Sequence, residues 1–226
     1  MREIVLDTET TGLDFKNGDR IIEVACLELY NHIATGNTLQ FYCSTEKKIS
    51  KDVVEIHGLT NEFLDKHKTF EQQYKKIIDF IKNDTLVIHN ADFDLGFINN
   101  ELKLIGAKPI QNECIDTVKL AKTKLNTRLA NLDFLCKRFS IDLSARKLHG
   151  ALLDCQLLSE VYLELTGGKQ TSLDLKKHTN NPKERLTKTK TNTHIIEKIK
   201  IKDEEILSHK EFSKSIKNSL WSKLDY

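Results

Sequence analysis

The chain of 226 residues is 39% hydrophobic and 30% charged, a composition typical of a soluble globular protein with a substantial core. It contains neither an apolar run of about 18 residues nor a signal-peptide pattern, so we expect a soluble, cytoplasmic protein with no membrane partner. Its five cysteines are odd in number and lack Cys-x-x-Cys spacing, which argues against a disulfide framework and a structural zinc site.

The formal charge of +2 is unevenly distributed along the chain. Residues 1–169 carry 22 Lys and Arg against 25 Asp and Glu, whereas residues 170–226 carry 13 against 8. The stretch 176–193 is rich in Lys, Thr and Asn, as flexible linkers are. We therefore predict one folded domain over 1–169, a linker over 170–193 and a basic interaction tail over 194–226.

The first part of the chain reads as strands. Ile4, Val5 and Leu6 form the short apolar run of a buried strand. Apolar patterning predicts further strands over 20–29 and 37–43, with turn residues at 35–37 between them, and so an antiparallel meander.

From residue 69 onwards, helical periodicity alternates with short apolar runs. The predicted helices cover 70–82, after a capping box at Thr69 and Gln72, then 95–105, 117–124, 131–139 and a long segment from Gly150 to Gly167. Strands are predicted over 86–88 and 114–116, and in the tail 195–201 alternates before a helix over 204–217. This order indicates an α/β domain with a mixed sheet.

Two carboxylates directly follow the first predicted strand. Because side chains alternate along a strand, Asp7 and Glu9 leave the same face, and Thr8 leaves the other. Close carboxylates at the end of a buried strand are tolerable when a cation lies between them, and oxygen ligands suit magnesium or manganese. An exposed acidic turn is the alternative for this pattern taken alone.

Three more residues are candidates for the same site. Asp94 lies where a strand gives way to a helix, the usual position of sites in α/β sheets, although a helix cap is the alternative. Asp154 is on the apolar side of the last long helix, where a carboxylate needs a cation or several donors. His149 can reach Asp154 only from the loop before that helix, because five residues along a helix separate the two by about 140°; a surface histidine is the alternative.

These residues fall within three motifs that resemble those of the DEDDh 3′–5′ exonuclease superfamily. The motifs are Asp7-Thr-Glu-Thr-Thr-Gly12, His89-Asn-Ala-Asp-Phe-Asp94 and His149-Gly-Ala-Leu-Leu-Asp154. Further matches at 54–59, Asp116-Thr117 and 148–168 resemble the ε proofreading subunits of bacterial DNA polymerase III. The resemblance implies a ribonuclease H-like exonuclease fold, with a mixed central sheet flanked by helices, that hydrolyses DNA from its 3′ end.

The resemblance also implies the roles of the site residues. Asp7, Glu9, Asp94 and Asp154 would bind two Mg²⁺ or Mn²⁺ ions, and His149 would be the general base of two-metal hydrolysis. One position departs from the family pattern, because Asp92 replaces a small residue and offers a rival carboxylate. We keep Asp94, which follows Phe93 as the motif requires.

Residues beside these motifs are candidates for contact with the terminal nucleotide. They are Thr8, Thr10, Thr11, His57, His89 and Phe93, together with the metal-binding Asp7, Glu9 and Asp154. For His57 a turn residue, and for Phe93 a core residue, is the simpler interpretation. Asp116 is a candidate for a supporting role behind the site, and Cys155 for packing.

The tail also resembles that of the ε subunits. Residues 170–175 resemble the peptide by which bacterial replication proteins bind the sliding clamp, with Gln170, Leu173 and Leu175 as anchors. The segment 194–226, with Trp221, would bind the polymerase III α subunit. The partners implied are therefore a single-stranded or frayed DNA 3′ end, the α subunit, the sliding clamp and a small accessory subunit.

Two other functions are compatible with parts of this pattern. An autonomous exonuclease of the same superfamily, acting on RNA or repair DNA, would share the catalytic motifs but not the tail. An inactive adaptor between clamp and polymerase would have lost a metal-binding carboxylate or His149, and all five are present.

Overall fold

A computed structural model describes residues 1–146, 148–168 and 202–215. The chain divides into two units, within 1–174 and 175–226. In the second, the described part is one helix, α8 (Asp203–Ser215). It agrees with the helix predicted over 204–217, whereas the strand expected over 195–201 lies outside the described residues. None of the described helices is both long and apolar enough to span a bilayer.

The first unit is built on a five-stranded mixed sheet in the order β3-β2-β1-β4-β5. Its strands are β1 (Arg2–Thr10), β2 (Ile21–Tyr30), β3 (Ile33–Tyr42), β4 (Thr85–Ile88) and β5 (Cys114–Asp116). β1, β2 and β3 form the predicted antiparallel meander, β4 pairs in parallel with β1, and β5 pairs in parallel with β4. The prediction of a mixed sheet is therefore confirmed.

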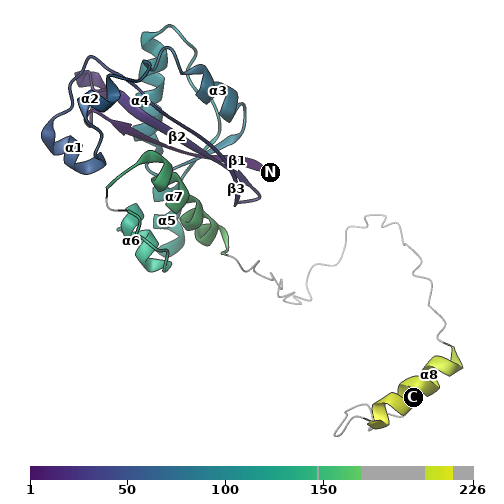
Figure 1. Ribbon diagram of the computed structural model, residues 1–226. Helices are drawn as coiled ribbons and strands as arrows, with labels where there is room; N and C mark the ends of the chain where they lie inside the picture. The colour runs from purple at the N-terminus through teal and green to yellow at the C-terminus, as the bar shows by residue number, and fades with distance from the viewer. Residues whose placement is uncertain (147, 169–201, 216–226) are drawn as a thin grey trace, which may run out of the picture. The chain divides into compact units, whose positions relative to one another are not determined.

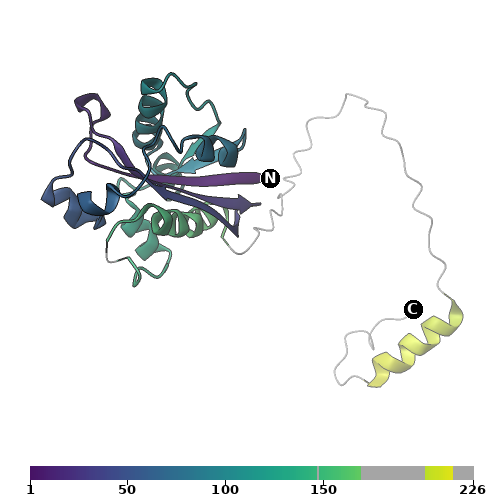
Figure 2. The same ribbon diagram turned by 45° about the horizontal axis from the view of Figure 1, so that its top comes forward.

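Helices cover both faces of this sheet, as Figures 1 and 2 show. α3 (Lys75–Ile81) and α4 (Ala91–Leu104) lie on one side, and α5 (Thr117–Leu125), α6 (Leu132–Arg138) and α7 (Ala151–Thr166) lie on the other. Two short helices, α1 (Lys51–His57) and α2 (Asn61–Leu64), connect β3 to α3, and a 3-10 turn, η1 (Phe15–Asn17), follows β1.

The period-2 alternation of β1 divides its side chains between two cores. Ile4 and Leu6 pack with α3 and α4, whereas Val5 packs in the cluster that contains α5, α6 and α7. All three side chains are fully buried, as the apolar run predicts. The same alternation decides which way the polar residues at the end of the strand point.

Four boundaries differ from the predictions. Helix α4 begins at Ala91 and not at Leu95, so Asp94 lies within its first turn and is not its N-cap. β1 continues through Asp7 and Glu9 to Thr10, with a bulge at its end. The hairpin turn is at Asn31 and His32, whose positive φ angles of 51° and 67° suit a two-residue connection, and not at 35–37. Helix α3 begins at Lys75 although Gln72 Oε1 accepts from the Thr69 N–H (3.2 Å), because 71–74 form turns after that cap. Helices α1 and α2 were not predicted.

Candidate active site

The four acidic candidates come together at one end of the sheet. Asp7 and Glu9 lie in the last part of β1, and Asp94 and Asp154 lie in the first turns of α4 and α7. Because β1 and β4 are parallel, α4 begins beside the end of β1. Asp94 and Asp154 are 3% and 6% exposed, so neither is an ordinary surface carboxylate.

The alternation of β1 places its two carboxylates on the α7 side and Thr8 on the α4 side. The Thr8 N–H and Oγ1 both donate to Asp94 Oδ1, at 3.0 and 2.7 Å. Asp94 is thus fixed to β1 by two hydrogen bonds from the residue between Asp7 and Glu9. The carboxylates from both sides of the sheet are therefore held together where β1 ends.

These carboxylates are in an environment that disfavours their charge. Burial and the neighbouring carboxylates of Asp94 and Glu9 raise the pKa of Asp7 well above its usual range. Burial and then Asp154 raise the pKa of Glu9 to about 8. Burial raises the pKa of Asp94, although its bonds from Thr8 oppose the shift. A set of all-oxygen donors with this surplus of negative charge fits divalent Mg²⁺ or Mn²⁺.

His149 lies in the segment before α7, which begins at Ala151. Its N–H donates to the Ile56 carbonyl (3.0 Å), so the end of α1 anchors the segment. Its half-exposed ring places Nδ1 3.3 Å from Asp154 Oδ2, and ligand atoms of Glu9, His149 and Asp154 all lie within 4.8 Å of one another. The histidine and the carboxylates therefore share one site.

Two residues of this site were not predicted from the sequence. Arg146 donates from Nε and Nη2 to the two oxygens of Asp154, at 2.6 and 2.7 Å. Glu23, buried on β2 and paired in register with Glu9, accepts from the Ala151 N–H (3.3 Å) and so fixes the start of α7. A lone arginine three residues before His149 was the available signal for Arg146, and a glutamate within an apolar strand was the signal for Glu23.

A pocket of about 400 Å³ opens onto these groups. Its lining residues are Asp7, His89, Asn131, Leu132, Asp133, Arg146, His149 and Asp154. Of the histidines proposed for substrate contact, His89 is therefore in the pocket, where Thr117 Oγ1 lies 2.8 Å from its Nδ1. Burial lowers the pKa of His89, which keeps its ring neutral near pH 7.

His57 is buried at the end of α1, close to His149. Its Nδ1 accepts from the Leu59 N–H (3.0 Å), and among the described residues no partner bonds its Nε2. Burial, and then the charge of His149, lower the pKa of His57. A neutral ring with an unpaired Nε2–H is a suitable donor to a ligand. Phe93 instead packs against Phe97, with ring centroids 4.9 Å apart, as a core residue does.

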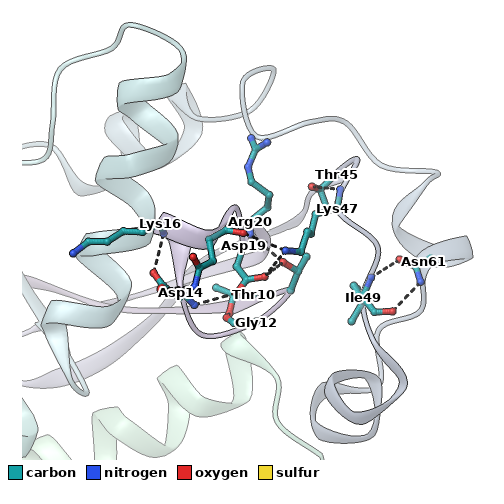
Figure 3. A network of polar contacts seen from close by, with 12 residues as sticks. Thr10, Gly12, Asp14, Lys16, Asp19, Arg20, Thr45, Lys47, Ile49 and Asn61 are labelled. Atoms are coloured by element: carbon teal, nitrogen blue, oxygen red, sulfur yellow. Dashed lines mark hydrogen bonds and ion pairs between the residues drawn. The ribbon is translucent and has the colours of Figure 1, made fainter.

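The loop after β1 is held by the carboxylate of Asp19, as Figure 3 shows. Asp19 accepts from the Asp14 N–H (3.1 Å) and from Thr11 Oγ1 (3.2 Å), and it pairs with Lys47 (3.3 Å). A Cβ on Gly12 would lie 2.4 Å from Asp19 Oδ2, so the close approach requires glycine. The loop beside the carboxylates is therefore rigidly built.

The hydroxyls of the three threonines are all engaged within the protein. Besides the bonds already described, Thr10 Oγ1 donates to the Gly12 carbonyl (2.5 Å), and Thr11 Oγ1 accepts from the Arg20 N–H (3.0 Å). Their role in substrate contact stays a prediction. The bonds show that Thr10 and Thr11 shape the loop and that Thr8 holds Asp94.

Three neighbouring residues have simpler roles. Asp92 is exposed and pairs with Lys119 on α5 (3.3 Å), away from Asp94. Asp116 accepts from the Val118 and Lys119 N–H groups as the N-cap of α5. Cys155 is buried, with its Sγ against the Ala25 carbonyl (3.6 Å). The docking candidates Gln170, Leu173, Leu175 and Trp221 lie outside the described residues and stay predictions.

Glu9→Gln should stabilise the protein in the presence of a chelator. The pKa of Glu9 is near 4.5 in the unfolded chain and about 8 in the folded protein. Its carboxyl therefore favours folding below pH 4.5, and this contribution to stability is lost as the pH rises through about 8. The stability gained by Glu9→Gln over the wild type should therefore increase between pH 6 and 8.5, by on the order of 2 kcal/mol. Thermal unfolding measures it, with exposed Glu55→Gln as control. A difference that stays constant with pH would contradict the assignment.

Comparison with known proteins finds relatives of this chain. Residues 4–162 match the model of the RNase_T exonuclease family. The DNA polymerase III subunit epsilon of Rickettsia felis is 43% identical over 223 residues, covering 96% of this chain and 97% of that protein. The Haemophilus influenzae subunit of the same name is 34% identical, covering 98% and 95%.

A solved structure shows the same fold. The nuclease domain of 3'hExo, a DEDDh family member bound to rAMP, superposes with a TM-score of 0.65 at 21% identity, over 75% of this chain and 94% of that one.

Proposed function

Because the chain belongs to the RNase_T exonuclease family and, within it, to the ε subunits of bacterial DNA polymerase III, we propose a mechanism for its 3′–5′ proofreading exonuclease activity. The substrate is a mispaired 3′-terminal nucleotide, released as a mononucleotide. The observation that supports the mechanism most is the meeting of Asp7, Glu9, Asp94 and Asp154 beside His149.

Asp7, Glu9, Asp94 and Asp154 would hold two Mg²⁺ or Mn²⁺ ions. Bound there, such ions stabilise the charge that develops on the scissile phosphate and lower the pKa of a water molecule. The carboxylates of β1 contribute from one side, and Thr8 keeps Asp94 directed towards them. Glu23 holds the first turn of α7, which carries Asp154.

His149 is the general base. Its ring is half exposed and lies in a segment outside the helix, so it can reach a water at the scissile phosphate and pass the proton to solvent. The contact of its N–H with Ile56 fixes the backbone while the ring stays able to turn.

His57 and His89 bind the terminal nucleotide. Both are neutral near pH 7, so they provide hydrogen bonds without adding positive charge to the site. Loss of either should raise KM more than it lowers kcat, because such contacts bind the substrate and the transition state alike.

The tail connects the nuclease to the cytoplasmic replication machinery. We assign 170–175 to the sliding clamp, the segment 194–226 to the polymerase α subunit, and the folded domain to a small accessory subunit. In α8, Leu207 is 62% exposed, as expected of a helix that packs against a partner. A tether of this kind raises the local concentration of the nuclease at the primer end to the order of 1 mM.

A chain ending at Gly168 should keep its nuclease activity and lose polymerase binding. All the proposed catalytic residues precede that position, whereas α8 follows it. Equilibrium binding to purified α subunit, with the full-length chain as reference, measures the loss. If both chains bound the α subunit with equal affinity, the tail would have no role in polymerase binding. Co-purification of the full-length chain with RNA but without a polymerase would favour an autonomous nuclease.

A further inference from the structure

The most unusual contact of the active site is that of Arg146. Its side chain is 8% exposed, and its guanidinium bonds both oxygens of Asp154 at 2.6 and 2.7 Å. Nη2 also lies 2.9 Å from His149 Nδ1, and Nη1 bonds Asp133 on α6. One cation therefore contacts the proposed base and one proposed metal ligand at once.

This geometry puts the arginine in competition with any other cation at Asp154. A bidentate guanidinium uses both carboxylate oxygens in the plane that a metal ion would also need. A dication bound at Asp154 would also face the positive charge of Arg146, in a partly buried place where repulsion is poorly screened. Binding of a divalent ion at Asp154 must therefore move the guanidinium.

The contact with His149 has a second consequence. A guanidinium only donates hydrogen bonds, so Nδ1 of His149 must be the acceptor while the contact lasts. That nitrogen is then unable to take a proton from water. Asp133 gives the guanidinium an anchor outside the carboxylate cluster, since its side chain is half exposed on α6.

We propose that Arg146 is an internal counter-cation, which holds Asp154 and His149 until a divalent ion binds. The guanidinium of Arg146 then moves towards Asp133 and releases both residues together. Arg146 is thus a positioning residue that couples ion binding to the freeing of the base. Arg146 keeps the negatively charged site ordered when divalent ions are scarce. Because it competes with these ions, it also lowers the affinity of the site for them. The inference rests on the proposed function, because it takes Asp154 as a metal ligand.

The test is Mn²⁺ binding to the full chain, followed by electron paramagnetic resonance of the free ion. Arg146→Gln should bind Mn²⁺ about tenfold more tightly than the wild type, because the competing charge is gone. Arg146→Lys keeps the charge but not the bidentate fork, and should fall between them. Arg138→Gln, which removes an exposed charge from α6, is the matched control and should leave affinity unchanged.

In chelator, Arg146→Gln should also unfold at a lower temperature than the wild type, with the deficit removed by Mg²⁺. If this variant fails to fold without ions, Arg146→Lys carries the test. The inference would be overturned if Arg146→Lys, or a folded Arg146→Gln, bound Mn²⁺ no more tightly than the wild type does. No Mn²⁺ binding by the wild type itself would instead overturn the proposed metal site.

Nitrogen NMR of the His149 ring provides a readout that a purely structural role would not change. In the wild type, Mg²⁺ should shift the Nδ1 resonance as the guanidinium leaves. In Arg146→Gln, Nδ1 should already be in the released position before Mg²⁺ is added. A wild-type resonance that does not respond to saturating Mg²⁺ would show that the two events are not coupled.

Discussion

Replacing Asp7 with alanine should abolish divalent-ion binding and nuclease activity together. Asp7 lies on β1 among Glu9, Asp94 and Asp154, and burial together with the charges of these neighbours raises its pKa, so it is central to the carboxylate cluster. Loss of an ion forfeits several kcal/mol of charge stabilisation, or roughly three or more orders of magnitude in kcat. Mononucleotide release from 3′-labelled DNA, with Mn²⁺ binding measured in parallel, gives both quantities.

The control for Asp7→Ala is a carboxylate of the same neighbourhood. Asp92→Ala removes an exposed side chain that pairs with Lys119, and should change neither ion binding nor activity by more than about twofold. Thermal unfolding in chelator should show Asp7→Ala to be folded, because the variant lacks a carboxyl whose ionisation is opposed by burial and by neighbouring carboxylates. Normal cleavage by Asp7→Ala, or inactivity of Asp92→Ala, would mean that the carboxylates are misassigned.

His149→Ala should lower turnover by roughly 100-fold or more while leaving ion affinity nearly intact, the expected effect of losing a general base. The half-exposed ring lies before α7, so its removal opens no large core cavity. Single-turnover kinetics at saturating Mg²⁺ isolate this step from substrate binding. His32→Ala, in the β2–β3 turn at the opposite end of β1, is the matched control. Unchanged turnover in His149→Ala would remove the residue from the mechanism.

The sheet could be predicted because its signals are local. The buried run of Ile4, Val5 and Leu6 and the alternation after it were enough to place Asp7 and Glu9 on one face. The hairpin turn was misplaced because 35–37 carry stronger turn residues than Asn31 and His32. Gly36 instead has a φ of 86° within β3, near the register shift of the β2–β3 pair.

The helices between β3 and α3 were missed because they are too short for periodicity to show. α1 has seven residues and α2 has four, so neither completes the pattern that identified α7. Yet α1 anchors the segment of His149 through the Ile56 carbonyl, a contact between residues distant in sequence.

The part of the site on β1, α4 and α7 was predicted because each residue follows a clear structural signal. Arg146 and Glu23 were not, because their importance depends on partners distant in sequence or on the path of an irregular segment. Glu23 meets α7 across 128 positions, and the Arg146 contacts depend on how the chain turns before His149. The resemblance to the DEDDh exonucleases identified the metal-binding candidates but gave no reason to examine either residue.

The most direct test of the account is to incubate the chain with 3′-labelled primer-template DNA, matched or mismatched at its last base pair, in Mg²⁺, Mn²⁺ or chelator. RNA of the same sequence serves as the competing substrate. We expect ion-dependent release of mononucleotides from the 3′ end, faster at the mismatched terminus and on DNA than on RNA, and none from Asp7→Ala. Release that persists in chelator or in Asp7→Ala, or no release under any ion, would contradict a carboxylate-held, two-ion proofreading nuclease.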